Sequence, residues 1–193
     1  MRLTLRWLWL AAVAPGGAGV ASAQLAPVPP PAEQQTADCS APVFATDQLV
    51  CSDPALRALD TELAGLLADA PERSSRWIEP QSQWFLRRSR CAFAEDHSAC
   101  AMFAYRERLA LMRSQGSEAK MLKANCNDLH IRTIAVEGDW IILIDREGRI
   151  AGIAGGNDAN NSWRPFLSAT WRSPYVFIKT QEGSSLKCEI SSM

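Results

Sequence analysis

The sequence predicts an α+β protein, a small disulfide-linked three-helix module followed by a small antiparallel β barrel or sandwich. Residues 38–113 are rich in Ala, Leu and Arg and place apolar residues at helical spacing. Residues 126–193 instead alternate β-branched and aromatic residues between turn signals. About 155 residues fit one domain or two small ones, and this change of pattern predicts two modules with a connector at 114–125.

Residues 1–23 have the pattern of a secretory signal peptide. Two arginines precede a short apolar run, and Ala21-Ser22-Ala23 forms a small-x-small cleavage site. The run is too short to cross a bilayer comfortably and is interrupted by Pro15. We therefore expect a soluble, periplasmic or secreted product without stable membrane insertion. Residues 24–37 hold four prolines and no apolar periodicity, which indicates an extended linker.

The predicted export determines how the cysteines are interpreted, because an even number of cysteines in an oxidising compartment indicates disulfide bonds. The chain has six: Cys39, Cys51, Cys91, Cys100, Cys126 and Cys188. Their spacing is too wide for a typical zinc site, so we predict no metal and no cofactor. The last two bracket the second module and are expected to pair. The first four allow three pairings; we favour bonds from the N-terminal segment to the corner between the second and third helices, since longer loops gain more stability.

Three helices are predicted in the first module. The first begins at Pro54, after the capping residues Ser52 and Asp53, and ends before Pro71. The second runs to about Cys91, with a core set that we assign to the bundle: Trp77, Trp84 and Phe85. The third begins after His97-Ser98 and carries apolar residues on one stripe.

Five or six short strands are predicted in the second module. Glycine, proline and asparagine clusters separate the candidates, which argues for a small antiparallel barrel or sandwich. The candidate strands are residues 129–136, 139–145, 149–155, 166–171, 175–180 and 186–190.

The first module resembles the lysozyme-inhibitor LprI-like N-terminal family of exported bacterial proteins. The resemblance rests on the order of Cys, Leu-Asp, Trp and Arg over about 75 residues. The matching residues are Cys39, Cys51, Asp53, Pro54, Leu56, Leu59, Asp60, Leu63, Gln81, Trp84, Arg88, Cys91, Cys100, Tyr105 and Arg108. Phe85 and Ser89 depart from the family's Leu and Asp. The resemblance implies a lysozyme inhibitor, since some members of the family inhibit that enzyme.

The second module is similar in outline to C-type lysozyme inhibitor domains but lacks their Ser-Gly-x-x-Tyr loop. In its place is a long polar stretch, which we predict as a binding loop because loops on rigid scaffolds commonly carry binding. The candidate binding residues are Asn157, Asp158, Asn160, Asn161, Ser162 and Trp163. Alternatively, this stretch is a hairpin tip with Trp163 packed inward.

Other polar residues are expected to be structural. Glu95, Asp96 and His97 favour a polar corner at the start of the third helix. Asp60 and Arg88 are expected to form a bundle salt bridge rather than a contact surface. His130 is predicted on the solvent face of a strand. With only two histidines and no assembled catalytic motif, we predict no enzyme activity.

Charge gives little information about partners. Loss of the signal peptide leaves 18 basic and 21 acidic residues, a net charge of −3. This balance does not favour nucleic-acid binding. The sequence therefore predicts an exported, non-catalytic binding protein of the cell envelope, with a lysozyme-type enzyme as its partner. The alternative is a structural or adaptor protein with no enzyme target.

Overall fold

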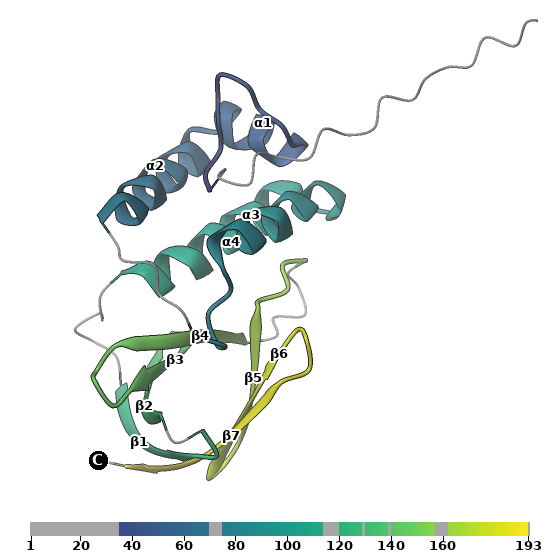
Figure 1. Cartoon of the computed structure of the whole chain (residues 1–193). Coiled ribbons are helices and arrows are strands. Elements are labelled where there is room, and N and C mark those ends of the chain that lie inside the picture. The colour runs from purple at the N-terminus through teal and green to yellow at the C-terminus, as the bar shows by residue number, and fades with distance from the viewer. Residues whose placement is uncertain are drawn as a thin grey trace, which may run out of the picture.

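The computed structural model describes residues 35–69, 75–113, 120–128, 130–138, 140–156 and 162–192. Within these ranges the chain forms helices and then a closed seven-stranded barrel, which confirms the α+β class. The helices lie together on one side of the barrel, above β4 in Figure 1. The predicted signal peptide and most of the predicted linker lie outside the described residues. None of the helices described here has the length and apolar character needed to span a bilayer.

The described residues before the barrel form four α-helices rather than the predicted three. They are α1 (Ala45–Ser52), α2 (Pro54–Asp69), α3 (Gln81–Ser89) and α4 (His97–Met112), with a 3-10 turn, η1 (Arg90–Phe93), after α3. The additional helix is α1, whose eight residues are fewer than the window over which apolar periodicity is recognised. Its first turn is held instead by the carboxylate of Asp47, which accepts hydrogen bonds from the backbone N–H groups of Val43 and Phe44.

The predicted cap of α2 is confirmed, whereas α4 begins two residues earlier than expected, at His97, and is capped by Asp96. The Asp53 carboxylate accepts hydrogen bonds from the N–H groups of Ala55 (2.8 Å) and Leu56 (3.1 Å), so α2 begins at Pro54 as expected. At the start of α4, the Asp96 carboxylate accepts from the N–H of Ala99 at 2.8 Å. These caps satisfy backbone donors that would otherwise have no partner inside the helix.

Three disulfide bonds are formed, and the predicted Cys126–Cys188 pair is among them. The other two bonds differ from the pairing that we favoured, because they are local: Cys39 pairs with Cys51, and Cys91 pairs with Cys100. The end of η1 and the start of α4 bring Cys91 and Cys100 to a Cα distance of 5.5 Å, a normal disulfide separation. Proximity therefore outweighs the larger entropic gain of long-range bridges.

The second module is a closed barrel rather than a sandwich. Its strands are β1 (Lys120–Cys126), β2 (Ile131–Glu137), β3 (Trp140–Asp145), β4 (Ile150–Gly156), β5 (Leu167–Arg172), β6 (Tyr175–Thr180) and β7 (Ser185–Ser192). Neighbouring strands follow the chain order, and β1 closes the barrel on β7. All pairs are antiparallel except β4 and β5, which run parallel. The prediction of an all-antiparallel sheet is wrong at this pair.

Strand β1 lies where we expected the connector. Its sequence, KMLKANC, has no β-branched or aromatic residue, so its propensity for a strand is weak. Leu122, Ala124 and Cys126 nevertheless point into the barrel, and β1 is hydrogen-bonded to both β2 and β7. Closure of the barrel, rather than local sequence preference, determines this strand.

Candidate functional site

The residues of the LprI-like motif form a buried network that joins the four helices. Arg88 in α3 is fully buried and donates hydrogen bonds to the Asp47 carboxylate in α1 and to the Tyr105 hydroxyl in α4. The Tyr105 hydroxyl donates in turn to Asp60 in α2, at 2.6 Å. Burial raises the pKa of Tyr105, so the hydroxyl keeps its proton. Arg88 thus pairs with Asp47 and reaches Asp60 only through Tyr105.

A second buried network lies between the helices and the barrel. The Arg87 guanidinium donates to both oxygens of Glu79, at 2.6–3.1 Å, and to Glu107 at 3.2 Å. Burial alone would lower the pKa of Arg87, but the hydrogen bonds and charges of the two carboxylates raise it above its ordinary value. Arg108, another motif residue, donates to the backbone oxygen of Glu79 and to the side chain of Gln81. This cluster orders the segment that leads into α3.

Each module inserts one tryptophan into the other. Trp77, which precedes α3, is 3 % exposed and packs in the barrel core, with its indole N–H donating to Asp128 at 2.8 Å. Trp163, which precedes β5, is 6 % exposed and packs in the helical core, with its N–H donating to Glu107 at 2.7 Å. The assignment of Trp77 to the helical bundle is therefore wrong. The exchange fixes the position of the two modules relative to each other.

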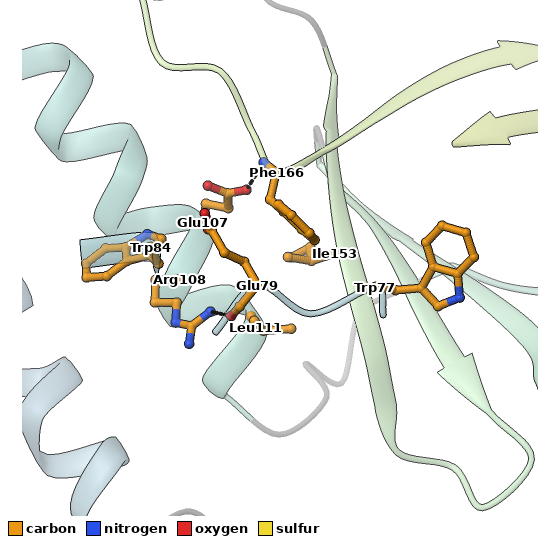
Figure 2. Close-up of a pocket in the computed structure, with 8 residues that line it drawn as sticks. All are labelled: Trp77, Glu79, Trp84, Glu107, Arg108, Leu111, Ile153 and Phe166. Carbon is orange, nitrogen blue, oxygen red and sulfur yellow. Dashed lines mark hydrogen bonds between the residues drawn. The ribbon is translucent and has the colours of Figure 1, made fainter. Parts of the chain in front are cut away.

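A glycine makes the insertion of Trp77 possible. A Cβ atom placed on Gly152 in β4 would lie 2.8 Å from the backbone oxygen of Trp77 and 2.9 Å from its Cβ. No real side chain tolerates such a distance to backbone, so the segment before α3 can approach β4 only at a glycine. Figure 2 shows the Trp77 ring directed away from the helices and toward the strands.

A small cavity lies between the two modules, and it is too small for a ligand. Its volume is about 10 Å³, which admits no more than about one water molecule. The cavity lies beside the buried cluster, and Figure 2 shows the Glu107 carboxylate accepting from the backbone of Phe166 within it. Its lining residues are Trp77, Glu79, Trp84, Glu107, Arg108, Leu111, Ile153 and Phe166. The contact between the modules is therefore a packed interface and not a binding cleft.

The Trp77–Asp128 contact should make the stability of the protein depend on pH. Burial would raise the pKa of Asp128, but hydrogen bonds from Trp77, the His130 backbone and Arg76 lower it below the ordinary value. Such a group stabilises the fold above its unfolded-state pKa of about 3.9, and this stabilisation is lost as pH falls through the folded-state pKa. Asp128→Asn should therefore cost stability at pH 6, and the difference from the native protein should shrink below about pH 3.9. Urea unfolding midpoints of both proteins between pH 2.5 and 6 measure this difference in stability. A difference that does not change with pH would contradict the expectation.

The corner between α3 and α4 is the most exposed apolar feature among the described residues. We call residues 90–96 the disulfide corner, because the Cys91–Cys100 bond closes it. Phe93 at its tip is 91 % exposed, whereas Cys91 and Cys100 are buried beneath it. A tight turn, a disulfide and the Asp96 cap fix its backbone. The corner therefore presents an aromatic side chain to solvent on a rigid support.

Charged residues surround Phe93 on this corner. Arg90 and Glu95 are exposed, and no ion pair joins Arg90 to a carboxylate of the described residues. His97, at the start of α4, is in hydrogen-bond contact with Thr46 of α1 at 2.9 Å. Burial and the charge of Arg88 lower the pKa of His97, so the imidazole is neutral at pH 7. His97 is thus part of the support, while Phe93 and Arg90 are free to contact a partner.

The predicted binding loop is only partly described. Asn157, Asp158, Asn160 and Asn161 lie outside the described residues, and Ser162 is exposed. Trp163 packs inward, as in the alternative that we considered, and the Arg87 guanidinium lies 4.0 Å from its ring centre. Sequence reasoning missed Phe93, since exposure of a single aromatic residue in a helical corner leaves no signal in the pattern. The binding role of the loop stays a prediction.

Comparison with known proteins supports the family resemblance for part of the chain. Lipoprotein LprI of Mycobacterium tuberculosis and that of Mycobacterium bovis are each 37 % identical to this chain over 81 residues. Part of the chain is LprI-like. The matched segment is 41 % of this chain and 41 % of the relatives, so less than half of their length is covered. No protein-family model matches the chain, and no solved structure matches it.

Proposed function

We propose that this protein is an exported, non-catalytic binding protein of the cell envelope that inhibits a lysozyme-type muramidase. The exposure of Phe93 on the rigid disulfide corner carries the proposal. Aromatic residues that enter a partner's pocket dominate binding energy in many interfaces, and a rigid support lowers the entropy cost of binding. The resemblance to the LprI-like family supports the identity of the target.

The chemistry of the disulfide corner suits the cleft of such an enzyme. Muramidases act through a pair of carboxyl groups in a cleft that holds a sugar chain. Phe93 offers an apolar ring for the sugar-binding surface of that cleft. Arg90, three residues earlier, offers a guanidinium that forms no ion pair with any residue the structure describes and that can bind a carboxylate through two hydrogen bonds. Insertion of this corner would block the enzyme without any reaction in the inhibitor.

The buried motif residues support the fold, whereas the exposed corner would contact the target. Asp60, Trp84, Arg88, Tyr105 and Arg108 are directed into the protein and cannot contact a target. They determine instead where α3 and α4 meet, and hence where the disulfide corner projects. A family motif that is structural is compatible with different targets for different members, since the exposed residues between the motif positions are free to vary.

Phe93→Ala should weaken inhibition by about 30-fold, the effect of losing about 2 kcal/mol at a central aromatic contact. The measurement is a titration of oxidised protein into C-type, G-type and I-type lysozymes digesting cell-wall suspensions. Trp171→Ala is the matched control, because Trp171 is another exposed aromatic residue, on the barrel, with 47 % exposure. Melting temperatures should show that both variants remain folded.

Three outcomes decide between the alternatives. Loss of inhibition in Phe93→Ala and in Arg90→Ala, with normal Trp171→Ala, supports the disulfide corner. Loss in Asn160→Ala/Asn161→Ala with normal Phe93→Ala would move the site to the predicted loop. Failure of the native protein to inhibit any of the three enzyme types at micromolar concentration would overturn the proposal, and would favour a structural or adaptor role in the envelope.

A further inference from the structure

The barrel has an outer face that the helices leave uncovered. The helices pack against the outside of β2, β3 and β4, where Leu111 and Ile78 contact the strand side chains. Strand β7 lies on the side of the barrel away from the helices in Figure 1. On β6, β7 and β1, more exposed residues alternate with buried ones, so every second side chain points to solvent, and the last three residues of β5 are all exposed. We call these outward side chains the open face.

Four cations lie on the open face, one on each strand: Lys123 on β1, Arg172 on β5, Lys179 on β6 and Lys187 on β7. All four are exposed, and no ion pair joins any of them to a carboxylate of the described residues. Glu189 on β7 is the single acidic side chain that these four strands direct outward within the described ranges. The open face is thus locally basic, although the whole chain carries a net charge of −1.

Two aromatic rings form the floor between these cations. Tyr175 and Phe177 are half-buried neighbours on β6, with ring centres 6.3 Å apart. The Lys187 ammonium lies 4.1 Å from the centre of Tyr175 and 5.8 Å from that of Phe177. The Arg172 guanidinium lies 6.0 Å from the Phe177 centre. These cation–π contacts hold both charges near the sheet, where they are positioned for a ligand.

The distance between the outermost cations favours an extended ligand. Three strand spacings separate β5 from β1, so the charges span about 14 Å across the sheet. A single small anion cannot contact residues at both ends of that distance. A chain with repeated negative charges can, and a rigid barrel loses little freedom when it binds one.

From these observations we propose that the open face binds an anionic glycan strand that carries carboxylate groups. Lys123, Lys179, Lys187 and Arg172 would pair with successive carboxylates, and the C–H faces of the sugars would pack beside Tyr175 and Phe177. This site is separate from the disulfide corner. It shares with the proposed function only the exported location, in which glycans are the abundant extended polyanions.

Other classes of polyanion fit the open face less well. Base stacking on single-stranded nucleic acid needs a free aromatic face, and Lys187 already covers the ring of Tyr175. Membrane insertion needs protruding apolar side chains, whereas Tyr175 and Phe177 are half-buried in the sheet. An acidic peptide would gain most by adding to a sheet edge, and the closed barrel offers none.

Binding of the full-length mature protein to polygalacturonate, a carboxylated glycan, tests the proposal. We expect saturable binding by isothermal calorimetry that weakens as NaCl rises, and no binding to neutral dextran. Lys179→Glu/Lys187→Glu should bind at least about tenfold more weakly, since two attractive pairs become repulsive. The flanking variant Lys123→Glu/Arg172→Glu, on different strands, should show the same loss if the first variant proves unstable.

Arg57→Glu/Arg106→Glu is the matched control, because it changes the net charge equally through two exposed residues of α2 and α4. Unchanged binding in this control supports a specific face. Equal weakening in the control would show a general charge effect and overturn the proposal. Equal or tighter binding of a thymidine oligonucleotide, or of vesicles of phosphatidylglycerol, would also overturn it. Lysozyme inhibition should be unchanged in the Lys179→Glu/Lys187→Glu variant, so the two proposals can fail independently.

Discussion

Replacement of Trp77 by alanine is expected to lower the free energy of unfolding by about 3–5 kcal/mol, the cost of truncating a large buried aromatic residue. The indole fills the barrel core beside Leu167 and Val176, and its N–H is the partner of a buried Asp128 oxygen. The substitution therefore leaves both a cavity and a carboxylate that has lost a donor. Urea unfolding followed by circular dichroism measures the change.

Two further variants separate the causes of that loss. Trp77→Phe keeps most of the apolar volume and removes only the N–H, so it should cost about 1–3 kcal/mol. Trp171→Ala, at an exposed position on β5, should change stability by less than about 0.5 kcal/mol. If Trp77→Ala were no more costly than Trp171→Ala, the indole would not be part of the barrel core in solution.

The exchange of tryptophans also predicts a single unfolding transition. Trp77 belongs to the segment before α3 but completes the barrel core, and Trp163 belongs to the barrel connection but completes the helical core. Neither core is complete without a residue from the other module. We therefore expect the described residues to unfold as one cooperative unit, although the sequence shows two compositional parts; a calorimetric scan with two separate transitions would contradict this.

Much of the fold could be predicted from local patterns. The start of α2 followed from Asp53-Pro54, since a cap and a proline at the first position act locally. The Cys126–Cys188 bond followed from the position of both cysteines at the ends of one module. Strand β6 agreed with its predicted residues 175–180, because alternation and flanking turn residues define it without reference to the rest of the chain.

The elements that were missed depend on contacts from distant parts of the chain. Helix α1 is held by Asp47 and its buried pairing with Arg88, 41 residues later. Strand β1 is held by β2 and β7. The insertion of Trp77 into the barrel depends on Gly152 in β4. A glycine in a strand indicates that another segment packs closely against it, but it does not identify that segment. Sequence spacing contains none of these relations, so they could not be predicted from it.

The same limit applies to the candidate site. The motif residues Asp60, Arg88 and Tyr105 were recognisable, but whether they served packing or contact depended on burial. The polar corner at Glu95, Asp96 and His97 was correctly placed at the start of a helix. The exposure of Phe93 beside it depends on how the corner folds, which the order of residue types does not show.

Arg88 should be the most sensitive position of the helical module. Arg88→Met keeps the apolar length of the side chain but leaves the fully buried Asp47 carboxylate without its ion pair. It also removes the donor to the Tyr105 hydroxyl. Loss of one partner of a buried pair typically costs about 3–5 kcal/mol, because the remaining charge keeps its desolvation cost. Arg90→Met, two residues later and exposed, is the matched control and should be nearly neutral.

A double variant tests whether the unpaired charge is the cause. Asp47→Asn removes the charge and keeps an oxygen for the N–H groups of Val43 and Phe44. If the unpaired carboxylate is responsible, Asp47→Asn/Arg88→Met should be more stable than Arg88→Met alone. The sum of the unfolding free energies lost in the two single variants should then exceed the loss in the double variant. Additive losses would show instead that Arg88 acts through packing against Phe85 and Tyr105, whose ring centres lie 4.3 and 5.5 Å from its guanidinium. In either case the Arg88 variants should lose lysozyme inhibition only in proportion to unfolding, because Arg88 positions the disulfide corner without touching its surface.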